Sequence, residues 1–139
     1  MAIYVLVHGA WGGSYAFRAV RKLLQADGHE VVTPSLTGIG ERSHLTGPHV
    51  TLSLHQLDLV NAVRYDDLTD VVLLGYSYGG MVVTGALDRI GDRVRELVYL
   101  DAFVPADGDS VATLTGGDPP GFPELGDPWS VAPPPREYK

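Results

Sequence analysis

The chain has 139 residues, enough for one domain, and its hydrophobic content of 45% argues against disorder. Its formal net charge of -7 argues against nucleic acid or an anionic membrane as a partner, and the lack of cysteine excludes disulfides, thiolate zinc sites and a cysteine nucleophile. No stretch approaches the roughly 20 apolar residues of a membrane helix, and the N-terminus has no signal-peptide pattern, so we expect a cytoplasmic protein.

The N-terminal part predicts a strand, a helix and a second strand. Residues 3–7 form the apolar, β-branched run of a buried strand, and the glycine-rich turn "HGAWGGS" follows it. A helix is expected over residues 14–27, ended by Gly28. One apolar stripe of this helix contains Phe17, Val20, Leu23 and Leu24. Residues 30–34 predict the second strand.

The next part repeats this alternation after a loop. Residues 35–49 are rich in turn residues and predict a loop. A helix follows, with Leu54, Leu57, Val60 and Val63 at helical spacing. This helix is expected over residues 53–65. A strand over 70–75, a helix over 80–90 and a strand over 96–100 are expected to follow it. This order predicts an α/β fold with a parallel sheet and helices on both of its faces.

The stretch "GYSYGG" places Ser77 between glycines, after an apolar strand and before a helix. G-x-S-x-G in that context predicts a nucleophile elbow, in which a sharp turn exposes the serine hydroxyl. Gly75 and Gly79 leave room where side chains would collide with the neighbouring strand and helix. The alternative is a glycine-rich turn whose serine only caps the helix; the flanking strand and helix favour the nucleophile.

A second turn is predicted at the same edge of the sheet. In "VLVHGAW" a strand runs into a His-Gly turn, and parallel strands bring their carboxyl ends together. We therefore predict an oxyanion hole made by the N–H groups of Ala10 and Tyr78. The glycine runs contain neither G-x-G-x-x-G nor a P-loop, which argues against nucleotide binding.

The stretches "VLVHGAWGGSYAF", "GHEVVTPSLTGIGERSHL", "VVLLGYSYGGMV" and "LVYLDAFVPADG" resemble the α/β-hydrolase superfamily. The chain looks most like small bacterial esterases related to plant methylesterases and hydroxynitrile lyases. This resemblance implies that residues 1–104 are the N-terminal part of the hydrolase core and that residues 105–139, rich in proline and glycine, begin a cap insertion. The lyases carry threonine after the first histidine of the oxyanion loop, whereas Gly9 stands here, which favours ester hydrolysis.

No histidine follows Ser77, although a serine nucleophile needs a general base. His8, in the oxyanion turn, is expected to hold that turn by hydrogen bonds. His29 is expected to be solvated at a helix–strand turn, and His55 to lie on the surface of its helix. His44 and His49 lie in the long loop. The resemblance implies that final strands of the sheet are missing from this chain and that a C-terminal segment of the hydrolase carries the base. The acid is either Asp101, at the end of the last predicted strand, or a later carboxylate.

The sequence thus predicts a serine hydrolase of the carboxylesterase type, acting on small, fairly apolar esters through an acyl-enzyme. Ser77 is the nucleophile, and Trp11, Tyr78 and Phe103 are expected to line an apolar pocket. No cofactor is implied, and no residue pattern has metal spacing. The alternatives are a lyase on the same scaffold and a non-catalytic ligand-binding protein of hydrolase fold.

Overall fold

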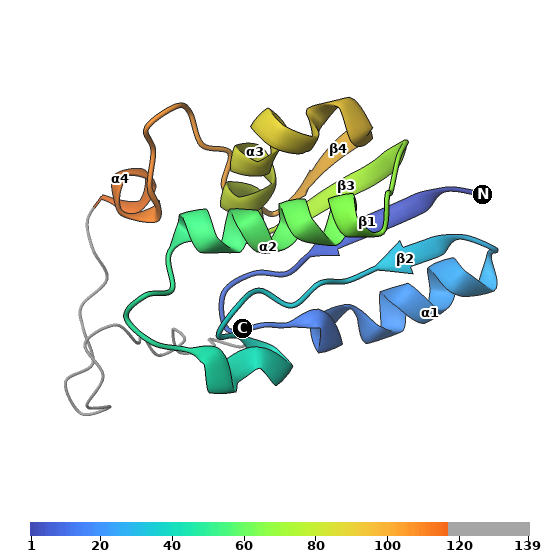
Figure 1. Cartoon of the computed structure of the whole chain (residues 1–139), viewed down its shortest axis with the longest axis horizontal. Coiled ribbons are helices and arrows are strands. Elements are labelled where there is room, and N and C mark those ends of the chain that lie inside the picture. Colours follow the sequence, from blue (N-terminus) through green and yellow to red (C-terminus); the bar gives the residue numbers. More distant parts are fainter. Residues whose placement is uncertain (117–139) are drawn as a thin grey trace, which may run out of the picture.

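The computed structural model describes residues 1–116 and contains a four-stranded, entirely parallel sheet (Figure 1). The strands are β1 (Ile3–Val7), β2 (Glu30–Val32), β3 (Val71–Tyr76) and β4 (Val94–Leu100). Their spatial order is β2-β1-β3-β4, so the chain first steps to one side of β1 and then crosses over to the other. The predicted α/β class with a parallel sheet is confirmed.

The helices lie on both faces of this sheet, as right-handed crossovers require. They are α1 (Arg18–Ala26), α2 (Leu52–Tyr65), α3 (Gly79–Ile90) and α4 (Val111–Thr115), with short 3₁₀ helices at Ser14–Phe17, Gly40–Leu45 and Gly91–Arg93. Figure 1 shows α2 and α3 side by side on one face of the sheet and α1 on the other. The long loop predicted over residues 35–49 therefore contains one short helix.

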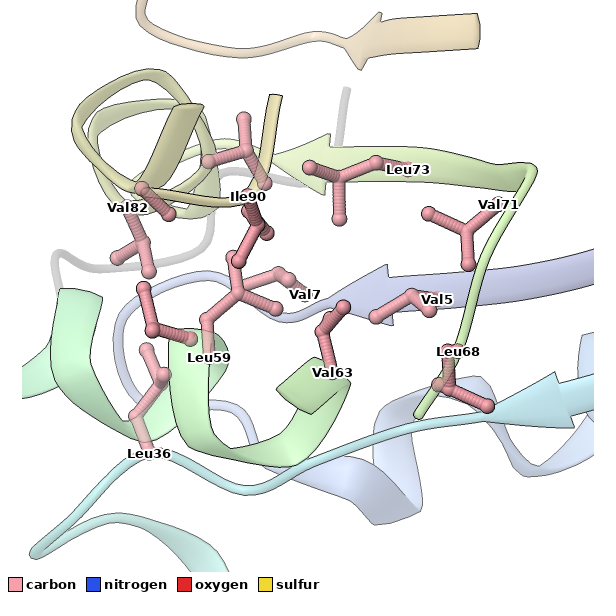
Figure 2. Packing of buried hydrophobic residues seen from close by; sticks show 13 residues of the cluster. Val5, Val7, Leu36, Leu59, Val63, Leu68, Val71, Leu73, Val82 and Ile90 are labelled. Carbon is pink, nitrogen blue, oxygen red and sulfur yellow. The ribbon is translucent and has the colours of Figure 1, made fainter. Parts of the chain in front are cut away.

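The main core lies between the central strands and the helices α2 and α3 (Figure 2). Alternate residues of β1 and β3 point to this face, because successive side chains of a strand alternate between its two sides. The fully buried members include Val5, Val7, Leu59, Val63, Val71, Leu73, Val82 and Ile90. Burying one such side chain contributes roughly 1.5–3 kcal/mol, so this layer holds β1 and β3 firmly under the site.

Helix α2 starts earlier than the sequence predicts. Thr51 is its N-cap, with the Leu54 N–H donating to Thr51 Oγ1 at 3.2 Å, whereas the prediction began the helix at residue 53. The buried stripe also differs, since Leu57 is 38% exposed and Leu59 is fully buried.

The sheet face that carries α1 is only partly covered by residues 1–116. Of the apolar stripe of α1, Val20 and Leu23 are 46% and 69% exposed, whereas Phe17, in the turn before the helix, is buried. One edge of the sheet is also open: among the described strands β4 pairs only with β3, and Leu100 at its end is 52% exposed.

The last described element is α4, a five-residue helix with a capping box between Ser110 and Thr113. The sequence predicts a weak helical stretch over residues 110–114, and α4 overlaps it. The rest of the segment expected to open a cap, residues 117–139, lies outside the described residues.

Candidate active site

Ser77 lies at the tip of the turn between β3 and α3 and has a left-handed backbone, with φ of +52°. A non-glycine residue in this region is strained and needs support from its surroundings. The support is threefold: Ser77 N–H donates to the Leu100 carbonyl (3.4 Å), and its carbonyl accepts from the N–H groups of Gly80 (3.0 Å) and Phe103 (3.2 Å). Its side chain remains partly exposed at the carboxyl edge of the sheet.

The two glycines of the motif are required by close backbone approach. A Cβ at Gly75 would lie 2.7 Å from the Gly79 carbonyl oxygen. A Cβ at Gly79 would lie 2.4 Å from the carbonyl oxygen of Val7, at the end of β1. The start of α3 is thus pressed against the first turn, which brings the serine and that turn together.

The N–H groups of Ala10 and Tyr78 are both without an acceptor among residues 1–116. The turn that carries Ala10 also touches the serine, because a Cβ at Gly9 would lie 3.0 Å from Ser77 Cβ. Tyr78 immediately precedes α3, and the first N–H groups of a helix have no partner within the helix. These are donors to which a developing oxyanion could bind.

His8 holds the first turn in place. Its ring is fully buried, Nδ1 lies 2.7 Å from the Gly9 carbonyl oxygen, and Nε2 accepts from the Leu36 N–H at 3.0 Å. Because the carbonyl can only accept, the proton is on Nδ1 and the ring is neutral. Burial lowers the pKa of His8, in keeping with this state. Both ring nitrogens are therefore occupied.

His55 is buried, and the expectation that it lies on the surface of its helix is wrong. It is only 5% exposed, and its Nε2 lies 2.8 Å from the Thr37 carbonyl oxygen while Nδ1 lies 2.9 Å from the Tyr78 hydroxyl. A signal for this was present in the sequence. His55 precedes Leu59 and Val63 by four and eight residues, a spacing that places all three on one face of a helix.

The other three histidines do not approach the serine by any hydrogen bond in the described part of the chain. His29 was expected to be solvated but is half-buried, where its Nδ1 accepts from the Ala2 N–H at 3.0 Å and its ring meets Tyr4 edge to face. His44 and His49 lie in the segment 35–49, as expected, and both are exposed. Within residues 1–116, no imidazole is hydrogen-bonded to Ser77.

Asp101 directly follows β4 in a tight turn with φ of +45°. Its side chain is exposed, and no donor in the described residues binds its carboxylate. The same turn leads to Phe103, whose main chain contacts the elbow but whose side chain is not among those that line the cavity described next.

A cavity of about 670 Å³ opens beside the two turns. Trp11 and Tyr78 line it, together with residues 37–40 and with His55. Burial raises the pKa of Tyr78 to about 12, so its phenol is neutral. The lining contains no Lys, Arg, Asp or Glu side chain, which suits an uncharged ligand.

Residues 1–116 contain neither a cluster of metal-binding side chains nor a membrane-spanning helix. No group of three or more His, Cys, Asp or Glu side chains there could hold a metal ion. Among the same residues, every helix is too short or too polar to cross a bilayer.

A parallel sheet with a strained serine at the end of a central strand is an α/β-hydrolase arrangement, and similarity to known proteins agrees with it. The model of the alpha/beta hydrolase family matches residues 4–138, and the chain belongs to that family. A carbendazim hydrolyzing esterase of Nocardioides is 52% identical over 114 residues, which cover 82% of this chain and 47% of that protein. Methylesterase 8 of Arabidopsis thaliana is 30% identical over 73% of this chain and 38% of its own length.

Solved structures show the same fold. An extracellular α/β-hydrolase from a Paenibacillus species aligns with a TM-score of 0.76 and 34% identity, over 81% of this chain and 46% of that one. That hydrolase shares structural and functional homology with tobacco salicylic acid binding protein 2. The chain thus spans about half or less of the length of the relatives that it matches.

Proposed function

We propose that this chain supplies the nucleophile and the oxyanion hole of a serine carboxylesterase. The observation that carries the proposal is the strained Ser77, held at the carboxyl edge of the sheet beside two N–H groups without acceptors among residues 1–116. The similarity to esterases, at up to 52% identity, supports the reaction class.

In this reaction Ser77 Oγ forms a bond to the ester carbonyl carbon while its proton passes to an imidazole. The carbonyl oxygen becomes negative and binds the N–H groups of Ala10 and Tyr78. When the tetrahedral intermediate collapses, the bond to the alcohol breaks, and the alcohol leaves with the proton from the imidazolium. Water then attacks the acyl-serine in the same way and releases the acid.

The imidazole comes from another polypeptide segment in this proposal. All five histidines precede Ser77, and the two buried ones, His8 and His55, use both ring nitrogens in other hydrogen bonds. This segment, called the docking segment below, could pair with the free edge of β4. Among the described strands β4 pairs only with β3, and Leu100 at its end is exposed, so this edge can accept a further strand. Asp101 is the proposed acid, and a carboxylate of the docking segment is the alternative.

The substrate class follows from the cavity. A volume of about 670 Å³ with an uncharged lining fits a small, fairly apolar ester, and no cofactor is needed for acyl transfer. Phe103 is proposed as a further pocket residue, in a part of the pocket that the docking segment completes. Residues 105–139 are proposed to begin a cap over this pocket.

The cytoplasmic location that the sequence leads us to expect stays a prediction, since one similar hydrolase is extracellular.

The test is ester hydrolysis by a fusion of the full chain to the part of the Nocardioides esterase that follows its matched segment. We expect hydrolysis of p-nitrophenyl acetate by the fusion, a loss of about 10⁴-fold or more in Ser77→Ala, and almost none by the chain alone. An Asp101→Asn fusion separates the two candidate acids, because its activity falls only if Asp101 orients the imidazole. Cleavage of mandelonitrile instead of the ester would indicate a lyase, and the absence of both reactions would indicate a binding protein.

A further inference from the structure

Hydrogen bonds from helix α2 hold Thr37, which follows β2 and lies beside the cavity. The Asp58 carboxylate accepts from the Thr37 N–H at Oδ2 (2.7 Å) and from the Thr37 hydroxyl at Oδ1 (2.8 Å). His55, one helical turn before Asp58, has its Nε2 2.8 Å from the Thr37 carbonyl oxygen. Arg42 lies 3.6 Å from the same carboxylate and partly balances its charge. All the polar groups of Thr37, which is only 7% exposed, are therefore bound to α2.

This fixed carbonyl orients the ring of His55. A carbonyl oxygen can only accept, so Nε2 carries a proton, and in the neutral imidazole Nδ1 is then an acceptor. The Tyr78 hydroxyl lies 2.9 Å from Nδ1 and donates to it. The two rings also meet edge to face, with their centroids 5.7 Å apart. Because His55 is only 5% exposed, the tyrosine side chain is attached to a buried group that is itself held in place.

The place of Tyr78 in the chain makes this attachment important. Tyr78 follows Ser77, whose left-handed backbone is strained, and its own N–H is one of the two proposed oxyanion donors. Among residues 1–116, the bond to His55 is the one hydrogen bond that the Tyr78 side chain makes. Without this bond the side chain can change rotamer, and the strained turn can relax together with it. The direction of the Tyr78 N–H would then be less well defined.

We propose that His55 is a positioning residue of the oxyanion hole, and that through the Tyr78 hydroxyl it keeps the Tyr78 N–H directed at the developing oxyanion. This role rests on the proposed function, in which that N–H binds the oxyanion. Misplacing a reacting group by about 1 Å can cost on the order of 100-fold in rate, and removing one oxyanion donor costs about 100- to 1000-fold. A donor that is loosened but still present should cost about 10-fold.

The test compares kcat and KM of the fusion enzyme for p-nitrophenyl acetate at pH 8. His55→Phe keeps a ring but removes both nitrogens, and Tyr78→Phe removes only the hydroxyl. Each should lower kcat about 10-fold and change KM by less than about 2-fold, because the oxyanion forms only on the way to the transition state. The double variant should be no slower than His55→Phe alone, since the hydroxyl has already lost its partner.

The matched control is Tyr99→Phe. The Tyr99 hydroxyl pairs with Thr84 Oγ1 of α3, so this variant also removes a tyrosine hydrogen bond, but Tyr99 does not line the cavity. We expect Tyr99→Phe to lower the free energy of unfolding about as much as Tyr78→Phe while leaving kcat unchanged. An equal fall of kcat in the control, a change in KM alone, or additive losses in the double variant would overturn the assignment. If His55→Phe does not fold, Tyr78→Phe and this control decide.

A second measurement uses the full 139-residue chain and needs no activity. NMR shifts of the His55 ring nitrogens show which of them carries the proton, and NMR relaxation reports how rigid the Tyr78 N–H is. We expect the proton on Nε2 and a rigid N–H that becomes more mobile in His55→Phe and in Tyr78→Phe but not in Tyr99→Phe. A proton on Nδ1, or an equally rigid N–H in both variants, would overturn the inference. A fusion without esterase activity, together with the expected NMR results, would instead reject the proposed function and leave the anchoring of Tyr78 by His55 in place.

Discussion

A methyl group at Gly79 should separate the two turns on which the site depends. Its Cβ would lie 2.4 Å from the Val7 carbonyl oxygen and 2.9 Å from that of His8. Ordinary van der Waals contact begins at 3.4 Å, so the first contact is 1.0 Å too short. Both obstacles are backbone atoms of β1 and the turn after it, and a change of rotamer cannot relieve them.

The cost can be estimated from this overlap. Overpacking a well-packed site typically costs about 1–3 kcal/mol, and we expect Gly79→Ala to lie at the upper end, at about 3 kcal/mol, because the backbone itself must move. For a chain of this length that corresponds to a fall in Tm of about 10 °C. The same displacement moves Ser77 away from the first turn, so the fusion carrying this variant should also lose esterase activity.

The measurement is urea unfolding of the full chain followed by circular dichroism. The control is Gly91→Ala, at the end of the same helix, where an added Cβ meets nothing within 4 Å and φ is -57°. We expect that control to be unchanged or more stable by about 0.5 kcal/mol. If Gly79→Ala were as stable as Gly91→Ala, the close packing of β1 against α3 that we infer would be wrong.

Two further predictions concern stability. Burial lowers the pKa of His8 in the folded chain, so its contribution is fully present above the unfolded value of 6.5 and is lost as the pH falls below it. The free energy of unfolding should therefore drop between about pH 7.5 and 5.5, by at most about 1.4 kcal/mol per pH unit for this one group. The drop should be less steep in His8→Gln, whose side chain can still accept from the Leu36 N–H. The same slope for both proteins in a pH series of urea titrations would contradict this. Thr51→Ala removes the acceptor of the Leu54 N–H and should cost about 1 kcal/mol in thermal unfolding. Ser53→Ala, two positions later and without a capping bond, is the control, and equal effects would speak against the cap.

The strands and the elbow could be predicted because local sequence determines them. The apolar runs at residues 3–7 and 71–74 belong to the two inner strands of the sheet, and most of their residues are buried; inner strands of parallel sheets read as unbroken hydrophobic stretches. The elbow could be placed because the backbone contacts at Gly75 and Gly79 allow no side chain, so the requirement is written in the residue type itself.

The errors concern residues whose environment is set by distant parts of the chain. His55 is buried because Thr37 and Tyr78, 18 residues before it and 23 after it, supply hydrogen-bond partners, and these partners become neighbours only in the fold. Val20 and Leu23 have the spacing of a buried stripe, but residues 1–116 leave them exposed. A periodic pattern indicates which face of a helix is apolar, and it does not say which polypeptide packs on it.

We propose that Ser77 is a nucleophile whose general base comes from another polypeptide segment. To test this claim, the full chain, and its fusion to the C-terminal part of the Nocardioides esterase, are treated with a fluorophosphonate, and the adduct is located by peptide mass spectrometry. A phosphonylated Ser77 in the fusion, together with unmodified protein from the 139-residue chain, is the expected result. Rapid modification of the chain by itself, or an adduct on any other residue of the fusion, would contradict the claim.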